Sequence, residues 1–265
     1  MQALSVVIIS YNEEKNISRC LGSLEGVADE VIVVDSFSDD NTVAVALSNG
    51  AIVKQSEFNG YINQKNKAIN LASNALVLLM DADEALSNEL AASILAAKND
   101  LTQTAYSMNR RSFFCGKFIT RGLWYPDRKL RLFDKRLGRC GGLDPHDKII
   151  MNEPVAVKHL HGDLLHYSFN TVEEYLERND AVSTIAARSL FEAGIKRPWT
   201  KLVFSPLWAF INGYFLRLGF LDGRKGLIIA THTANQSFSK YQKLRRLHKE
   251  EFKKNNLGIN FQQQV

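Results

Sequence analysis

The 265-residue chain lacks the cysteine patterns of disulfide-built and zinc-binding proteins. Its three cysteines, Cys20, Cys115 and Cys140, are widely spaced and form no C-x-x-C pair. Disulfide scaffolds and structural zinc sites both need patterned cysteines, so the sequence indicates neither and fits a reducing compartment. The N-terminal residues, MQALSVVIISYNEE, also lack the basic segment and cleavage site of a signal peptide, and we expect them to form a strand.

Two phosphate-binding motifs are missing as well. The sequence contains neither G-x-G-x-x-G nor G-x-x-x-x-G-K-[ST]. A dinucleotide-binding fold and a P-loop are therefore disfavoured, because both depend on a glycine-rich turn around the phosphates.

A long uncharged apolar run is also absent. The most apolar stretch, residues 199–221, is interrupted by Lys201, Pro206, Asn212 and Arg217. It makes a poor membrane span. We expect a helix that either lies at a membrane interface or packs on the body of the protein.

Acidic residues are scarce in the last third of the chain. Residues 1–186 contain 19 Lys and Arg against 24 Asp and Glu, whereas residues 187–265 contain 14 against 4. Such a basic segment favours an anionic partner, namely membrane lipid, nucleic acid or a phosphorylated substrate. A solvated basic helix without a partner is the simpler alternative. No nucleic-acid recognition motif accompanies the charge, so we expect an anionic membrane surface.

The first hundred residues alternate apolar strands with amphipathic helices. This alternation predicts an α/β fold with a mostly parallel sheet and helices on both faces. The expected strands are 4–10, 30–36, 51–55 and 75–81, and the expected helices are 14–24, 41–50, 63–72 and 87–99.

Beyond residue 100 the pattern changes twice. Residues 104–119 and 128–136 read as strands with polar alternation, and helices begin near Val172. We therefore predict a domain over 1–170, made of two halves at 1–100 and 101–170. A basic helical extension then covers 171–265.

Three of the predicted parallel strands end in polar clusters. Ligands of open parallel sheets bind outside the carboxyl ends of the strands, so the clusters should open onto one crevice. Bare carboxylates would repel a nucleotide diphosphate, and a divalent cation such as Mg²⁺ or Mn²⁺ removes that conflict. The Asp-x-Asp pair also occurs in simple turns and caps, but the other two clusters favour a metal site. The clusters are Ser10-Tyr11-Asn12-Glu13, Asp35 to Asp40, and Asp81-Ala82-Asp83-Glu84.

Other polar residues near these strand ends have two possible roles. We expect Asp35 to contact a base or ribose. Glu13 either bonds the nucleoside or caps the first helix, and Lys65 either neutralises ligand charge or is a surface lysine. Capping of the following helix is the favoured role for Ser38, Asp40 and Thr42.

The sequence resembles family 2 glycosyltransferases of the GT-A fold. The matching pieces are SVVIISYNEEKNI, EVIVVDSFSDDNT and VLLMDADE, in the expected order. The resemblance implies a nucleotide-sugar donor, a divalent metal at the Asp-x-Asp and inversion at the anomeric carbon. It makes 1–170 the catalytic domain, with a nucleotide-sugar-binding half at 1–100 and an acceptor and catalytic half at 101–170. It places Tyr11, Asn12, Glu13 and Asp35 at the nucleoside, Asp81 near the ribose and metal, and Asp83 on the metal. Ser36 stands where the usual pattern has glycine.

Later segments resemble the subgroup that adds β-glucose to a heptose of the lipopolysaccharide inner core. They are GLWYPDRKLRLFDKR, DPHDKI, LLHYSF and FLDGRKGLIIATHTANQSFSKYQKL. The resemblance implies UDP-glucose as donor. It also implies a cytoplasmic protein, peripheral on the cytoplasmic face of the inner membrane.

The catalytic pair of this subgroup corresponds to His146-Asp147. An inverting transfer needs a base for the acceptor hydroxyl, and Asp147 is the best candidate, with His146 orienting it. Alternatively, the two residues form a structural turn after Pro145.

Three further residues have either a ligand-binding role or a structural role. His166 is either a metal ligand or a satisfied core histidine. Arg128 and Arg131 either grip a phosphate or cover the solvent face of a strand.

Other classes of protein are compatible with parts of the sequence. A binding or scaffold protein would keep the fold without turnover. A nucleotidyltransferase would also use acidic strand ends with Mg²⁺, but SYNEEKN is not a glycine-rich basic loop. A glycosyltransferase of the same fold acting on another membrane-associated or protein acceptor is the remaining alternative.

Overall fold

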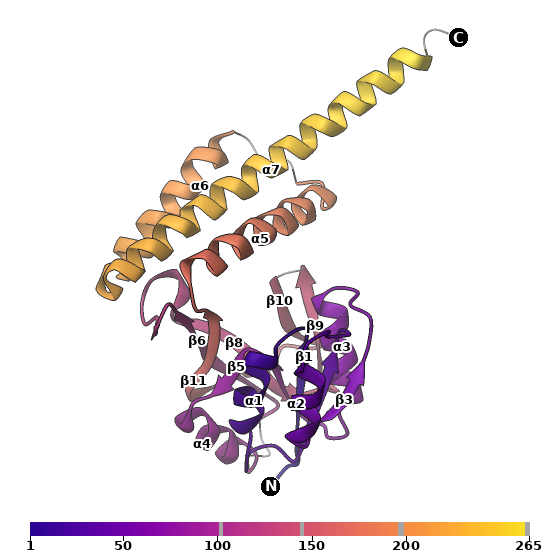
Figure 1. The fold of residues 1–265 in the computed structure, drawn as a ribbon, viewed down its shortest axis with the longest axis vertical. Helices are drawn as coiled ribbons and strands as arrows, with labels where there is room; N and C mark the ends of the chain where they lie inside the picture. The colour runs from indigo at the N-terminus through magenta and orange to yellow at the C-terminus, as the bar shows by residue number, and fades with distance from the viewer. Residues whose placement is uncertain (101–102, 144–145, 196–198, 263–265) are drawn as a thin grey trace. The chain divides into compact units, whose positions relative to one another are not determined.

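The computed structural model describes residues 1–100, 103–143, 146–195 and 199–262, with side chains except those of His146 and residues 254–262. The chain forms two compact units (Figure 1). The first comprises residues 1–120 and 124–170, and the second comprises residues 121–123 and 171–265.

The first unit is an α/β domain in which the predicted elements appear within a few residues of their expected bounds. Its elements in chain order are β1 (Leu4–Ser10), α1 (Glu14–Gly22), β2 (Glu30–Asp35), α2 (Thr42–Ser48), β3 (Ile52–Gln55), α3 (Tyr61–Leu71), β4 (Leu76–Asp81), β5 (Glu84–Leu86), α4 (Asn88–Ala97), β6 (Ala105–Phe114), β7 (Lys117–Phe118), β8 (Asp127–Asp134), β9 (Gly138–Leu143), β10 (His146–Met151) and β11 (Lys158–Phe169). The 3-10 turn η1 (Gly122–Trp124) lies between β7 and β8 in the chain, and its first two residues belong to the second unit.

The main sheet has the strand order β3-β2-β1-β4-β8-β6-β11-β5. The first four strands are parallel, as the continuous apolar runs predict. β8 and β5 join antiparallel to their neighbours, while β11 runs parallel to β6. β9 and β10 form a separate hairpin.

The sheet curls back on itself between β4 and β5. Three Cα–Cα steps join Asp81 to Glu84, which reach at most ~11 Å. Four strand spacings separate β4 from β5 in the sheet order, or ~19 Å along a flat sheet. The short connection therefore requires curling, and it places the Asp81–Asp83 turn across the carboxyl edge of the sheet.

The alternation of side chains along β1 and β4 divides the core in two. On one face Val6, Ile8 and Leu78 pack with residues of α1, α2 and α4. On the other face Val7 and Leu79 pack with α3 and with the β9–β10 hairpin. Helices thus cover both faces, as predicted, and the hairpin completes the second cover.

The second unit is helical and contains α5 (Val172–Glu192), α6 (Thr200–Ile211), the π-helical turn η2 (Asn212–Leu216), the 3-10 turn η3 (Gly219–Asp222) and α7 (Arg224–Gln262). α5 and α6 both lie beside α7 (Figure 1). Thr171 and Glu174 form a capping box that begins α5. None of the described helices is both long and apolar enough for a membrane span.

Gly162 in β11 is a position where both conformation and space require glycine. Its φ is +90°, and a Cβ there would lie 2.3 Å from the backbone nitrogen of Leu90 in α4. We expect Gly162→Ala to lower the free energy of unfolding by about 3 kcal/mol or more, because backbone atoms cannot move aside. Urea unfolding followed by circular dichroism measures the change.

Gly50→Ala is the matched control. Gly50 has a φ of +79°, but no atom lies within 4 Å of the point that an added Cβ would occupy. Gly50→Ala should lower the free energy of unfolding by only about 1 kcal/mol, the cost of an L residue in a positive-φ conformation. Equal losses in the two variants would contradict the close packing of β11 on α4.

Candidate active site

The polar strand ends of the first unit lie side by side. Parallel pairing sets Ser10 opposite Asp35, and Ile9 opposite Asp81. The three clusters that follow β1, β2 and β4 therefore share the carboxyl edge of the sheet, as the sequence predicts.

Side-chain hydrogen bonds join the loops after β1 and β2. The Asn12 backbone N–H donates to Ser38 Oγ at 2.9 Å, and the Asp39 N–H donates to Asn12 Oδ1 at 3.0 Å. Asn12 has a φ of 53°, a conformation that asparagine tolerates better than most residues. Tyr11 beside it is 59% exposed, so its ring is accessible to a ligand.

Asp35 is fully buried beneath its own loop. It accepts hydrogen bonds from Ser10 Oγ at 3.0 Å and from the Ser38 N–H at 2.9 Å. In this conformation it fixes the loop that follows β2, and contact with a nucleoside stays a prediction.

Not all of the residues predicted to cap helices form bonds to a helix. Asp40 Oδ1 accepts from the N–H of Thr42, the first residue of α2, but Ser38 bonds Asp35 and not the helix. Glu13 precedes α1 without a side-chain capping bond, so that role was wrong; its carboxylate accepts from Asn16 Nδ2 at 2.8 Å.

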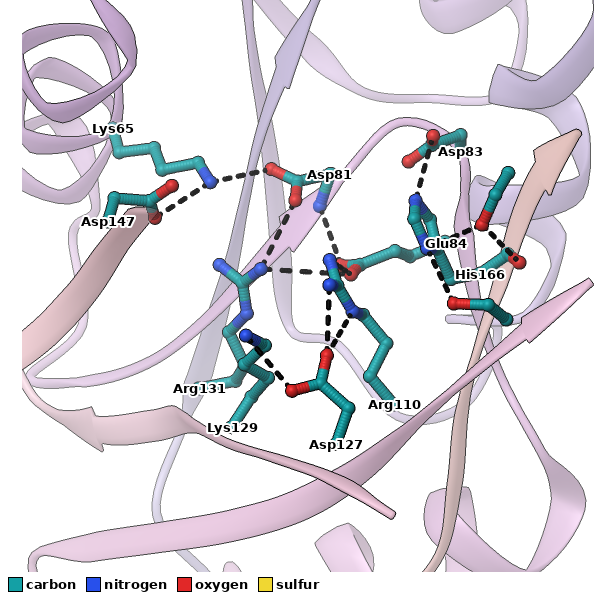
Figure 2. A network of polar contacts seen from close by, with 12 residues as sticks. Lys65, Asp81, Asp83, Glu84, Arg110, Asp127, Lys129, Arg131, Asp147 and His166 are labelled. Atoms are coloured by element: carbon teal, nitrogen blue, oxygen red, sulfur yellow. Dashed lines mark hydrogen bonds and ion pairs between the residues drawn. The ribbon is translucent and has the colours of Figure 1, made fainter. Parts of the chain in front are cut away.

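Lys65 joins two carboxylates from separate elements. Its Nζ lies 3.0 Å from Asp81 Oδ1 and 2.9 Å from Asp147 Oδ2 (Figure 2). α3 carries the lysine, β4 ends in Asp81, and β10 carries Asp147. The side chain of Lys65 is only 3% exposed, so the alternative of a surface lysine was wrong.

A second chain of charges begins at the other oxygen of Asp81. Arg131 Nη2 lies 3.1 Å from Asp81 Oδ2 and 3.7 Å from Glu84 Oε1. Arg110 lies 3.8 Å from Glu84 and 2.9 Å from Asp127, which also pairs with Lys129 at 3.1 Å (Figure 2). Carboxylates therefore fix the positions of the arginine and lysine side chains at this edge of the sheet.

The charge states of this network follow from burial and pairing. Burial by itself would raise the pKa of Asp81, but Lys65 and Arg131 outweigh it and hold that pKa far below its ordinary value of 3.8. Burial raises the pKa of Glu84, an effect that Arg131 offsets and that the neighbouring Asp81 carboxylate reinforces. Asp81 is thus a firm anion, whereas Glu84 is the carboxyl that gains a proton more easily.

Two buried polar atoms in the network keep unused bonding capacity. Within the described part of the chain, Glu84 Oε1 and Arg131 Nε have no hydrogen-bond partner. Buried polar groups are normally satisfied, so these atoms leave capacity for a ligand or water at this edge.

Asp83 faces His166 across the curl of the sheet. His166 Nε2 lies 3.2 Å from Asp83 Oδ2. The other ring nitrogen, Nδ1, lies 2.8 Å from Ser168 Oγ and 3.2 Å from Ser112 Oγ. A hydroxyl can donate or accept, so these serines support either tautomer and leave Nε2 available as a ligand.

This pair fits a divalent cation. Neighbouring ligands of an octahedral ion with bonds of ~2.1 Å lie ~3 Å apart, close to the observed separation. No group of three or more His, Cys, Asp and Glu side chains that could hold a metal occurs among the described residues. A cation here would therefore take two protein ligands and complete its shell with phosphate oxygens and water. Asp81 could join only by giving up an ion pair.

Asp147 lies on the β9–β10 hairpin beside Lys65 and Cys140. Cys140 Sγ is 3.7 Å from Asp147 Oδ2. Burial, reinforced by the Asp147 charge, raises the pKa of Cys140 to about 12, so its thiol stays protonated at neutral pH. His146 begins β10, but its side chain lies outside the described part of the structure, as does Pro145.

The two candidate arginines are not brought together. Arg131 is buried and Arg128 is exposed. The pairing of β8 with β6 changes register between Leu130 and Leu132, so Arg131 lies at a bulge that separates it from the regular strand carrying Arg128. Only Arg131 belongs to the charge network, and phosphate contact stays a prediction for both residues.

Sequence reasoning missed several members of the network. Glu84 lay in the predicted acidic cluster, which was its signal in the sequence, but it was given no role; at the start of the buried strand β5 it needs a cation. Arg110, Asp127 and Lys129 carried none, because strand pairing between β6 and β8 decides that they meet.

Known proteins are similar to this chain over most of its length. A family model described as "Glycosyl transferase family 2" matches residues 5–156. An uncharacterised glycosyltransferase of Rickettsia typhi is 31% identical over 257 residues, which are 93% of this chain and 88% of that protein. The lipopolysaccharide core biosynthesis glycosyltransferase LpsC of Rhizobium meliloti is 29% identical over 254 residues, which are 90% of this chain and 93% of LpsC.

A solved structure shares the fold. The mannosyltransferase PcManGT of Pyrobaculum calidifontis, in complex with GDP-Man and Mn²⁺, superposes with a TM-score of 0.56 at 16% identity. The match covers 92% of this chain and 87% of that one.

The Lys65 ion pairs yield a pH-dependent prediction. Lys65→Met leaves Asp81 and Asp147 short of a cation and should lower the free energy of unfolding at pH 7 by about 3–5 kcal/mol. The low pKa of Asp81 in the folded wild type means that its pairing stabilises the fold above about pH 4 and that this contribution fades in acid. The deficit of the variant should therefore be unchanged down to about pH 4 and clearly smaller at about pH 2.5 than at pH 7, as measured by urea unfolding.

Lys158→Met is the control. Lys158 pairs with Asp100 at 3.0 Å, but its side chain is 56% exposed. The Lys158→Met variant should lose no more than about 1 kcal/mol of its free energy of unfolding at either pH. A pH-independent deficit in Lys65→Met would show that packing, and not charge, accounts for its loss.

Proposed function

The chain belongs to glycosyl transferase family 2 and is a glycosyltransferase, and we propose that it transfers glucose from UDP-glucose, with inversion, to a heptose of the lipopolysaccharide inner core. Its fold is the predicted GT-A fold. The observation that carries the proposal is the Asp83–His166 pair, set 3.2 Å apart at the edge where the nucleotide-binding strands end.

In this proposal Asp83 and His166 hold a divalent cation, Mg²⁺ or Mn²⁺. When bound, the cation neutralises the donor diphosphate and makes it a competent leaving group. Ser112 and Ser168 orient the imidazole through Nδ1. The mannosyltransferase with the same fold was solved with Mn²⁺, which supports the choice of metal class.

Lys65 and Arg131 supply positive charge beside the same site. Both are buried and both are oriented by Asp81. Cations held in place before the reaction stabilise developing phosphate charge without reorganisation. Tyr11, Asn12 and Glu13 line the neighbouring strand end, where the nucleoside would lie.

Asp147 is the proposed base. Its carboxylate would take the proton of the acceptor hydroxyl as that oxygen attacks the anomeric carbon. It contacts Lys65 at 2.9 Å, so acceptor binding would exchange this contact for one with the hydroxyl, while Lys65 keeps Asp81. His146, its neighbour in the chain, would orient it.

The acceptor assignment is supported by the relative LpsC, whose description names lipopolysaccharide core biosynthesis. The match runs over most of both chains and so includes the acceptor half of the first unit. The choice of UDP-glucose as the donor rests on the resemblance of the later segments to inner-core glucosyltransferases.

The metal site is tested by Asp83→Asn. This change keeps the size of the side chain but removes the charge, and it should abolish Mn²⁺-dependent binding of UDP-glucose because His166 alone is a weak site. Isothermal titration with UDP-glucose, with and without Mn²⁺, measures the loss. Glu153→Gln, an exposed change away from the network, should bind as wild type. Normal metal-dependent binding by Asp83→Asn would refute the site.

The base is tested by Asp147→Asn. The variant should bind UDP-glucose with Mn²⁺ normally yet transfer glucose about 10²–10⁴-fold more slowly, because the amide cannot accept the proton. UDP release in the presence of a heptose-containing core acceptor measures the transfer. Asp147→Glu retains a carboxylate and should recover a substantial part of the rate; transfer by Asp147→Asn at the wild-type rate would exclude this residue as the base.

A further inference from the structure

The outward face of α6 and the turns after it is made of large apolar side chains. Phe204 is 62% exposed and Trp208 is 60% exposed, and no residue of α6 is fully buried. We call this surface the α6 face; its exposed members are Trp199, Val203, Phe204, Leu207, Trp208, Phe215, Leu216, Leu218, Phe220 and Leu221.

α6 is apolar on its exposed side as well as on its less exposed side, unlike an ordinary surface helix. Phe204 and Trp208 are four residues apart and lie on one side, where a surface helix normally carries polar residues. The less exposed positions Leu202, Pro206, Ala209, Phe210 and Ile211 are apolar too, and Ser205 among them bonds α7, with its Oγ 3.1 Å from Ser237 Oγ. Scattered exposed apolar residues need no explanation, but a contiguous patch of this kind marks an interaction surface.

The charge around the α6 face has a single sign. Between Ala193 and Lys249 the sequence has eleven Lys and Arg but only one acidic residue, Asp222, which is buried. Lys201 is exposed at the start of α6, and Arg217 and Arg224 are exposed after its end. The apolar stretch is thus flanked by cations on both sides along the chain.

We propose that the α6 face docks this protein on an anionic lipid bilayer. Its aromatic and aliphatic side chains enter the boundary between head groups and acyl chains, while Lys201, Arg217 and Arg224 meet lipid phosphates. α6 has 12 residues, so it lies in the interface and does not span it.

The charge pattern selects a bilayer over a second copy of the chain. Two α6 faces packed against each other would bring identical cations together with no exposed acidic residue between Ala193 and Lys249 to pair with them. An anionic bilayer offers both the apolar layer and the opposite charge.

This inference rests on the proposed function in one respect, because a lipid-anchored acceptor is what makes docking useful to the enzyme. Binding to vesicles that contain neither donor nor acceptor tests it separately. Failure of docking with normal transfer to a soluble core oligosaccharide would overturn only this inference.

The experiment is co-sedimentation of the full chain with phosphatidylcholine vesicles, with and without phosphatidylglycerol. Wild type should bind the anionic vesicles, and Phe204→Ser/Trp208→Ser should bind at least about tenfold more weakly, because two large anchors are lost. Leu47→Ser, an equally exposed change on α2 in the first unit, should bind as wild type. Since these side chains are exposed, urea unfolding should be little changed in either variant.

The charge contribution is tested with Lys201→Gln/Arg217→Gln. Each cation near an anionic surface strengthens binding about fivefold at low salt, so the pair should weaken binding about 25-fold on anionic vesicles. Residual binding to neutral vesicles should be unaffected. Equal loss on both kinds of vesicle would contradict recognition of anionic lipid.

Insertion of the α6 face into the bilayer is measured as quenching of tryptophan fluorescence by brominated lipids. Two of the three tryptophans, Trp199 and Trp208, belong to the α6 face. Wild-type emission should be quenched on vesicle binding, and quenching should disappear in Trp199→Phe/Trp208→Phe. The proposal is overturned if Phe204→Ser/Trp208→Ser binds vesicles like wild type. It is also overturned if wild type ignores vesicles and instead forms a dimer that this variant dissociates.

Discussion

The candidate site depends on one electrostatic constraint, the pairing of Asp81 with Lys65 and Arg131. A carboxylate at the end of the buried strand β4 is tolerable only because two buried cations meet its two oxygens. Those cations come from α3 and β8, which lie on different sides of β4 in the chain. The same contacts extend to Asp147 and Glu84, so the donor edge and the proposed base share one charge network.

The curl of the sheet determines which other residues lie beside this network. Because two residues connect β4 to β5, the last strand in the sheet order must return beside the middle of the sheet. β11 pairs with β5 and therefore carries His166 to Asp83. The Asp83–His166 pair thus arises next to Asp81, whose own oxygens are already paired, and the two aspartates of one short turn have different partners.

The helical unit follows a different physical rule. Its internal contacts are partly polar, such as the Lys243 ammonium held by Asp180 and Ser183, while large aromatic side chains of α6 face outward. That arrangement is unfavourable in water and favourable at a lipid surface, where apolar side chains leave water and cations meet phosphates. Catalysis and docking are therefore assigned to separate parts of the chain, each with its own charge balance.

The amino-acid sequence by itself determined the parallel half of the sheet, the covering helices and the acidic strand ends, because these depend on periodicity within about ten residues. It also indicated the family, through motifs that retain that local order. It did not reveal that Lys65 is buried, that Arg131 is buried while Arg128 is exposed, or that Arg110 and Asp127 join the network. Those facts follow from register between strands, curling of the sheet and the position of the β9–β10 hairpin. Such contacts join residues far apart in the chain, so only the tertiary structure decides which charges meet.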